Sequence, residues 1–213
     1  MLALSKILYN QDIFFLLLLT SFFLVALIKG FYWKHAKLLF KGSFSQRFAN
    51  QYLREENSFT ERVNLITFLL MSLNFTLIIV KFKNIIDLQS IITVFFLVLL
   101  FYLVKITSIK FLGFLFKLRD LSNLAVFFSL LFDKTFGFLL FPILIASYFF
   151  LFNISFYLLL LTLCLLLGLS CLKLFWFWKI GTNSFGLSPF YIFLYLCFLE
   201  FFPVLLLAKR IFY

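Results

Sequence analysis

Residues 188–209 read SPFYIFLYLCFLEFFPVLLLAK, an apolar run long enough to cross a lipid bilayer as a helix. The run opens with Ser188 and Pro189, a typical helix start in which serine caps the helix and proline takes its first position. It contains one carboxylate, Glu200, close to its middle, and Pro203 follows three residues later. This pattern predicts a membrane-spanning helix at 189–208.

The rest of the chain has the same apolar character. Hydrophobic residues make up 65% of the 213 residues and charged residues only 13%, which excludes an ordinary water-soluble domain. Because each crossing needs about 20 apolar residues, the chain has room for about six spans. We therefore predict an all-α, polytopic membrane protein with a single integral membrane domain, 1–213, and spans at about 13–28, 63–80, 85–104, 135–152, 156–174 and 189–208.

The net charge of +11 lies mainly in the connections between these spans. In a membrane protein such charge sets the topology and attracts anionic lipid headgroups, so we expect a lipid bilayer and no nucleic acid as partner. Of the 19 lysines and arginines, 14 fall in connections on one side of the membrane, Lys134 among them, and 5 fall on the other side. The positive-inside rule then predicts six spans with both termini on the non-cytoplasmic side.

The longest connection, 29–62, contains an aromatic stripe. Phe40, Phe44, Phe48 and Tyr52 recur every four residues with basic and polar residues between them. This spacing predicts an amphipathic helix in the headgroup layer of the cytoplasmic leaflet, and the alternative is a loop with chance periodicity. The candidate membrane-surface residues here are Lys34, Lys37, Phe40, Lys41, Phe44, Arg47 and Phe48, and the interfacial aromatics Trp176 and Trp178 join them after the fifth span.

Several boundaries are predicted from capping and charge. Ser58 and Glu61 have the spacing of a capping box that opens the second span. Lysines interrupt the apolar pieces between 105 and 119, which favours an interfacial segment. The stretch 121–132 is too short to span, so we expect it at the membrane surface, with a re-entrant segment as the alternative, and Asp133 as the cap of the fourth span.

Glu200 is the strongest candidate for a polar site inside the membrane. An ionised carboxylate at that depth is costly, so it is expected to be protonated, hydrogen-bonded to another helix or in contact with water. Pro203 leaves the carbonyl of Leu199 without its helical partner, which adds a polar group nearby. With Tyr195 and Cys197 these residues form either a proton-titrating or ligand-binding site, or an interhelical hydrogen bond that stabilises packing.

Other chemistry is sparse in the sequence. Asn74 in the second span is interpreted as an ordinary helix-packing residue, with a place on a path to Glu200 as the alternative. His35 is the only histidine, which excludes metal and haem sites that need two. The three cysteines have no CxxC spacing, and no glycine-rich phosphate loop is present. We therefore predict no catalytic, cofactor-binding or metal-binding residues, and no enzyme activity.

The terminal helix also resembles the C-terminal signature of an uncharacterised family of small polytopic inner-membrane proteins of Bacteroidota. The informative part is the Tyr-x-Cys-x-x-Glu-x-x-Pro spacing formed by Tyr195, Cys197, Glu200 and Pro203. The family is catalogued as a domain of unknown function. The resemblance implies a bacterial inner-membrane protein and supplies no activity.

Two hypotheses on function follow from these features. The first is a non-enzymatic integral inner-membrane protein, an assembly or accessory subunit of a cell-envelope complex, with a membrane-protein partner or a homo-oligomer. The second is a small proton-coupled transporter or channel-like protein that uses Glu200. A lipid-modifying enzyme is disfavoured because acid–base partners are missing.

Overall fold

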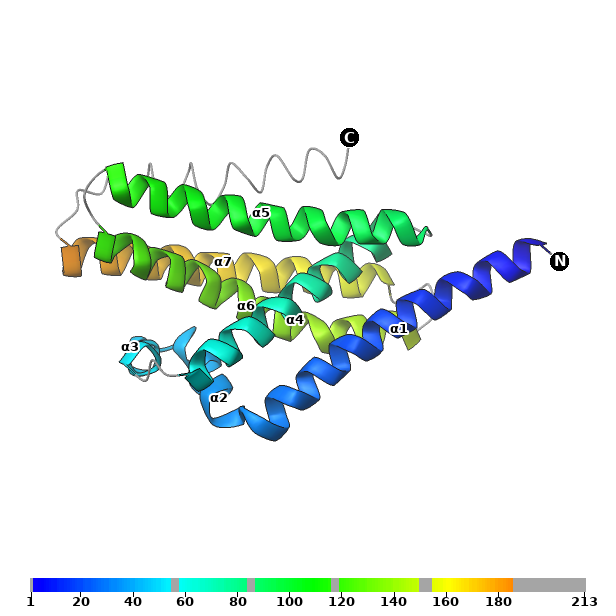
Figure 1. Ribbon diagram of the computed structural model, residues 1–213, viewed down its shortest axis with the longest axis horizontal. Helices are drawn as coiled ribbons and strands as arrows, with labels where there is room; N and C mark the ends of the chain where they lie inside the picture. The colour runs from blue at the N-terminus through cyan, green and yellow to red at the C-terminus, as the bar shows by residue number, and fades with distance from the viewer. Residues whose placement is uncertain (1, 55–57, 84–86, 116–118, 150–154, 186–213) are drawn as a thin grey trace. The chain divides into compact units, whose positions relative to one another are not determined.

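The computed structural model describes residues 2–54, 58–83, 87–115, 119–149 and 155–185. All regular elements in these residues are α-helices, as predicted (Figure 1). In chain order they are α1 (Leu2–Phe31), α2 (Trp33–Gly42), α3 (Gln46–Arg54), α4 (Ser58–Lys83), α5 (Leu88–Leu115), α6 (Arg119–Phe149) and α7 (Ser155–Phe185).

Among the described residues, four helices are long and apolar enough to cross a membrane. Their apolar stretches are Ile13–Phe31, Phe59–Lys81, Leu88–Phe111 and Ser122–Phe149. They contain the predicted spans 13–28 and 63–80 and most of 85–104 and 135–152. Helix α7 holds a shorter apolar stretch, Leu160–Trp176, at the predicted fifth span, and the predicted sixth span lies outside the described residues. By its helix composition the chain is a multi-pass membrane protein.

Helix α6 differs from the sequence-based prediction. It runs without a break from Arg119 to Phe149, so Asp133 lies inside a helix and is not the cap of a separate span. The predicted division between 121–132 and 135–152 is therefore wrong. The physical reason lies in tertiary contacts. Lys134 and Thr135 are both buried, with Lys134 hydrogen-bonded to Asn64 of α4 and Thr135 to Ser43 in the turn after α2.

Helix α5 also extends further than predicted. It continues past residue 104 to Leu115 and includes Lys105 and Lys110, which were expected to interrupt the apolar segment. Lys105 is buried, and its Nζ lies 5.9 Å from the centre of the Tyr102 ring one turn earlier. A long lysine side chain can cover apolar surface while an aromatic face stabilises its ammonium group, so the helix need not end there.

The aromatic stripe of the first connection is helical but broken in two. Helix α2 ends at Gly42, and α3 starts at Gln46 after a turn in which the amides of Phe44 and Ser45 donate to the carbonyl of Lys41. A Cβ atom on Gly42 would lie 3.2 Å from Cα of Ala49, so glycine allows the two helices to pack closely. The single helix expected from Phe40 to Tyr52 is wrong.

The described chain forms two compact units, which we treat separately. The first contains the described residues of 1–98 and 133–166, and the second contains the described residues of 99–132 and 167–185. In the second unit the rings of Phe128 and Trp176 stack at a centroid distance of 6.0 Å, beside the buried Ala125, Leu131 and Phe132.

In the first unit α1 runs opposite to α4 and α6. Phe14 stacks on Tyr148 at 5.7 Å, and further along α1 the ring of Phe22 lies 6.3 Å from that of Phe141. Towards α4, the Nζ atom of Lys81 lies 5.8 Å from the Phe14 ring. Along these contacts the residue numbers rise in α1 while they fall in α4 and α6, so α1 is antiparallel to both helices. The predicted order of spans requires these directions, because α1 is the first span, α4 the second and α6 the fourth.

Candidate functional site

The residues that stood out in the sequence lie outside the described part of the structure. Glu200, Pro203, Tyr195 and Cys197 all belong to 186–213. The candidate site is therefore built from the polar side chains that the described helices of the first unit hold away from solvent. Three contacts between helices define it.

The first contact joins three helices through Asn74. This residue of α4 is fully buried, and its Oδ1 accepts a hydrogen bond of 2.6 Å from Ser21 Oγ of α1. Its Nδ2 donates to the carbonyl oxygen of Gly137 in α6 at 2.8 Å. Both ends of the amide are used, so Asn74 stabilises the packing of α1, α4 and α6 without leaving a buried group unsatisfied.

The second contact involves a buried lysine. Lys134 of α6 is 6% exposed, and its Nζ donates to Asn64 Oδ1 of α4 at 3.0 Å. The acceptor is a neutral amide. A buried ammonium group is costly, and a single hydrogen bond to a neutral group offsets that cost only in part.

The third contact attaches the α2–α3 hairpin to α6. The hydroxyls of Ser43, in the turn between the helices, and Thr135 share a hydrogen bond of 2.5 Å in which either can donate. The rings of Phe40 and Phe138 lie 4.4 Å apart close by. Because Thr135 directly follows Lys134, the second and third contacts lie at the same level of α6.

Two further side chains attach the hairpin to α4. The hydroxyl of Tyr52 donates to the carbonyl oxygen of Thr60 at 3.2 Å, and burial raises the pKa of this phenol well above its ordinary value. Tyr52 therefore remains a neutral donor at physiological pH. The ring of His35 stacks on Phe59 with the planes 2° apart and the centroids 6.1 Å apart.

The candidate membrane-surface residues have mixed positions. The exposed ones are Lys34, Lys37, Lys41, Phe44, Arg47 and Trp178, the half-buried ones are Phe40 and Phe48, and Trp176 is buried against Phe128. The Nζ atom of Lys41 lies 5.1 Å from the centre of the Phe48 ring. The basic side chains thus point outward, while the stripe's aromatic side chains divide between the protein interior and the surface.

The contacts of the first unit are made by hydroxyl, amide, amine and backbone groups. Within the described ranges no group of three or more histidine, cysteine or acidic side chains could hold a metal ion. The sequence pointed to Asn74 only as an ordinary helix-packing residue and assigned Lys134 to a connection. Ser43 and Thr135 were not singled out at all, because nothing local in the sequence brings them together.

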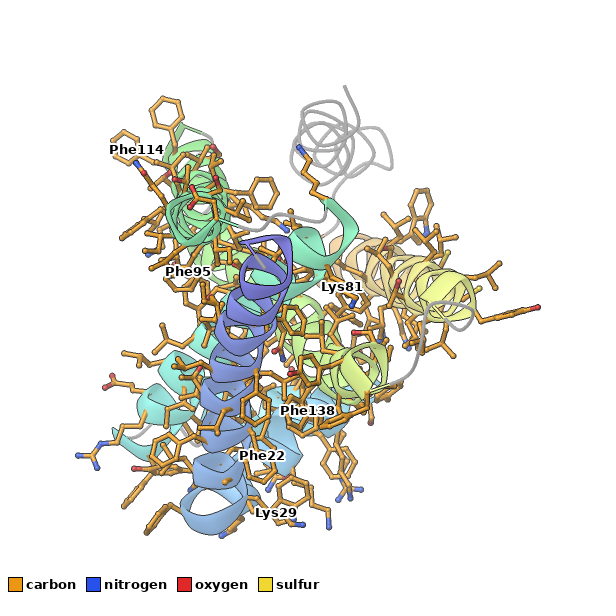
Figure 2. All side chains as sticks on the ribbon, turned by 90° about the vertical axis from the view of Figure 1, so that its right-hand side faces the viewer. Phe22, Lys29, Lys81, Phe95, Phe114 and Phe138 are labelled. Atoms are coloured by element: carbon orange, nitrogen blue, oxygen red, sulfur yellow. The ribbon has the colours of Figure 1, made fainter. Side chains whose placement is uncertain are left out.

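The outer surfaces of the long helices α1 and α5 in the first unit carry large apolar side chains. Along α1, Leu16, Phe22 and Phe23 are each more than half exposed, and Figure 2 shows the Phe22 side chain on this helix. On α5, Phe96 is 63% exposed. Such surface suits lipid chains or other transmembrane helices.

Comparison with known proteins identifies the family but supplies no activity. No curated protein and no solved structure matches the chain. One family model matches residues 14–211, which include the predicted terminal helix and Glu200. The chain therefore belongs to the family described as a domain of unknown function, DUF4271.

Proposed function

We propose that the protein is a non-enzymatic integral membrane subunit that supports the assembly of a cell-envelope complex. One observation carries this proposal. The buried polar side chains of the first unit bind one another across helices, in the Ser21–Asn74–Gly137, Lys134–Asn64 and Ser43–Thr135 contacts. They stabilise the helix packing, and the apolar exterior is left for lipid and partner helices.

The proposed membrane arrangement has six spans. Helices α1, α4, α5 and α6 supply four, α7 the fifth and residues 189–208 the sixth. Moving Lys134 from a connection into α6 leaves the excess of basic residues on the same side. The positive-inside rule then places the α2–α3 hairpin in the cytoplasm and both termini in the periplasm of the inner membrane.

Purification of the tagged full-length protein in a mild detergent tests the proposed role. We expect a reproducible stoichiometric partner or a homo-oligomer, identified by native mass and by mass spectrometry of the co-purified chains. Exposed apolar positions on one helix, such as Leu16 and Phe22, can be changed to alanine to locate the contact. An inert monomer, recovered both in detergent and in lipid nanodiscs, would refute the proposal.

A second candidate function is a small proton-coupled transporter that uses Glu200. The buried amine of Lys134 favours it, because ionisable groups inside spans are uncommon and often functional. Glu200→Gln keeps the side-chain shape and removes its titration. Full biological function of a normally expressed Glu200→Gln variant would eliminate this candidate.

A further inference from the structure

The α2–α3 hairpin, Trp33–Arg54, carries a net positive charge. It contains five basic residues and no aspartate or glutamate. The five are exposed, namely Lys34, Lys37, Lys41, Arg47 and Arg54. The exposed basic side chains of the hairpin thus lie along two short helices and not at the ends of membrane spans.

On α2 the charges form a single face. Lys34, Lys37 and Lys41 are three and seven residues apart, which places them on one side of the helix. The opposite side holds Ala36 and Leu39, which are 0% and 1% exposed. The apolar face of α2 is thus covered by protein, and the lysine face is turned outward.

Helix α3 repeats this arrangement. Arg47 and Arg54 are seven residues apart on its exposed side, whereas Ala49 and Tyr52 are buried. An amphipathic helix bound to lipid by its apolar face would leave that face open in the protein. Here the apolar faces serve tertiary packing, so any attraction between the hairpin and a membrane must come from the basic face and from residues at its edges.

Exposed aromatic side chains border the lysine face. Trp33 at the start of α2 is 44% exposed, and Phe44 just after its end is 64% exposed. Phe31, at the end of the preceding candidate span, is 78% exposed. Aromatic side chains beside lysines are typical of the headgroup layer, where the rings contact apolar groups and the ammonium groups contact phosphates.

We propose that the lysine face of α2 binds the phosphate groups of anionic phospholipids in the surrounding bilayer, with Trp33 and Phe44 anchoring the hairpin at headgroup depth. Charge complementarity selects an anionic partner. The exposed aromatics favour a lipid over an acidic soluble protein, because in water they would remain uncovered. The proposal does not depend on the role as an assembly subunit.

The test uses the purified full-length protein in a neutral detergent. Its thermal unfolding midpoint is measured while phosphatidylglycerol or phosphatidylcholine is added to the micelles. We expect phosphatidylglycerol to raise the midpoint more than phosphatidylcholine, in a salt-sensitive way. The triple variant Lys34→Gln/Lys37→Gln/Lys41→Gln should lower the apparent affinity for phosphatidylglycerol by roughly 100-fold, given the attraction of each basic residue for an anionic surface.

A matched control removes the same charge elsewhere. Lys81→Gln/Lys83→Gln/Lys110→Gln changes three exposed lysines outside the hairpin and should keep the preference for phosphatidylglycerol. Lys34→Arg/Lys37→Arg/Lys41→Arg should also keep it. If the glutamine triple variant does not fold, single Lys→Gln variants should each weaken the lipid effect several-fold.

Four results would overturn the proposal. Two concern the ligand: phosphatidylcholine, or inorganic phosphate alone, raises the unfolding midpoint as much as phosphatidylglycerol does. Two concern the variants: the lysine-face variant responds to phosphatidylglycerol as the wild type does, or the control variant loses as much of that response as the lysine-face variant. Capture of an acidic soluble protein by the same lysines, with no lipid effect, would identify a protein-docking surface instead. None of these outcomes depends on whether a membrane partner is found.

Discussion

Asn74 of α4 donates from Nδ2 to the carbonyl oxygen of Gly137 in α6 at 2.8 Å, and the two helices also approach each other closely at Gly137. A Cβ atom on Gly137 would lie 2.6 Å from Cα of Met71. The hydrogen bond therefore forms at a crossing that only glycine allows, as is common where membrane helices pack through small residues and polar groups.

Gly137→Ala should destabilise the protein by about 1–3 kcal/mol, because the added methyl group meets backbone and the helices must separate. Unfolding in detergent, followed by circular dichroism, measures the change. Gly168→Ala is the control, since a Cβ atom there has nothing within 4 Å and should cost no stability. Equal stability of the Gly137 and Gly168 variants would contradict the close crossing.

The Lys134–Asn64 contact predicts an asymmetry between its two partners. Asn64→Leu removes the acceptor of a buried amine and should cost about 1–3 kcal/mol. Lys134→Met replaces the amine by an apolar side chain of similar length and should be neutral or stabilising. The double variant should recover the stability lost in Asn64→Leu, and a double-mutant cycle of unfolding free energies measures this coupling. Equal destabilisation by both single changes would refute the interpretation.

The Ser43–Thr135 contact should hold the hairpin against α6. Thr135→Val keeps the side-chain shape but removes the hydroxyl, so the α2–α3 segment should open more often. Trypsin cleavage after Lys41 and Arg47, or hydrogen exchange of 33–54, should become several-fold faster. Thr107→Val is the matched control, because that exposed hydroxyl bonds only within its own helix. A hairpin that opens equally fast in both variants would show that the contact does not restrain it.

The buried phenol of Tyr52 predicts a loss of stability at high pH. Burial raises its pKa in the folded protein, so the unfolded chain releases this proton first, at a pH of about 10. The contribution of Tyr52 is therefore complete below that pH and is lost as the pH rises through the folded-state value. Tyr52→Phe should be less stable at neutral pH by about 1 kcal/mol, through loss of the hydrogen bond to Thr60, and should lose stability less steeply above pH 10.

Comparing the unfolding free energy of wild type and Tyr52→Phe as a function of pH isolates this one phenol, since the other tyrosines are common to both proteins. Parallel profiles of unfolding free energy for wild type and Tyr52→Phe would contradict the assignment of a raised pKa to Tyr52.

Much of the helix layout follows from local sequence. The start of α4 at Ser58 coincides with the predicted capping box, and the apolar stretch of α1 contains the predicted first span. Errors arose where charges interrupt an apolar run. Asp133 and Lys105 were interpreted as boundaries, yet both lie inside helices. Asp133 precedes two buried residues with partners far along the chain, and Lys105 lies beside the ring of Tyr102.

The membrane class and the approximate positions of the helices can be predicted from sequence, because the length of an apolar run and the charges at its ends are local properties. Which polar residues are buried depends on the tertiary structure. Ser43 and Thr135 are separated by 92 residues, and Asn64 and Lys134 by 70. The free energy of burying such a group depends on its partner, and no local pattern contains a partner so far along the chain.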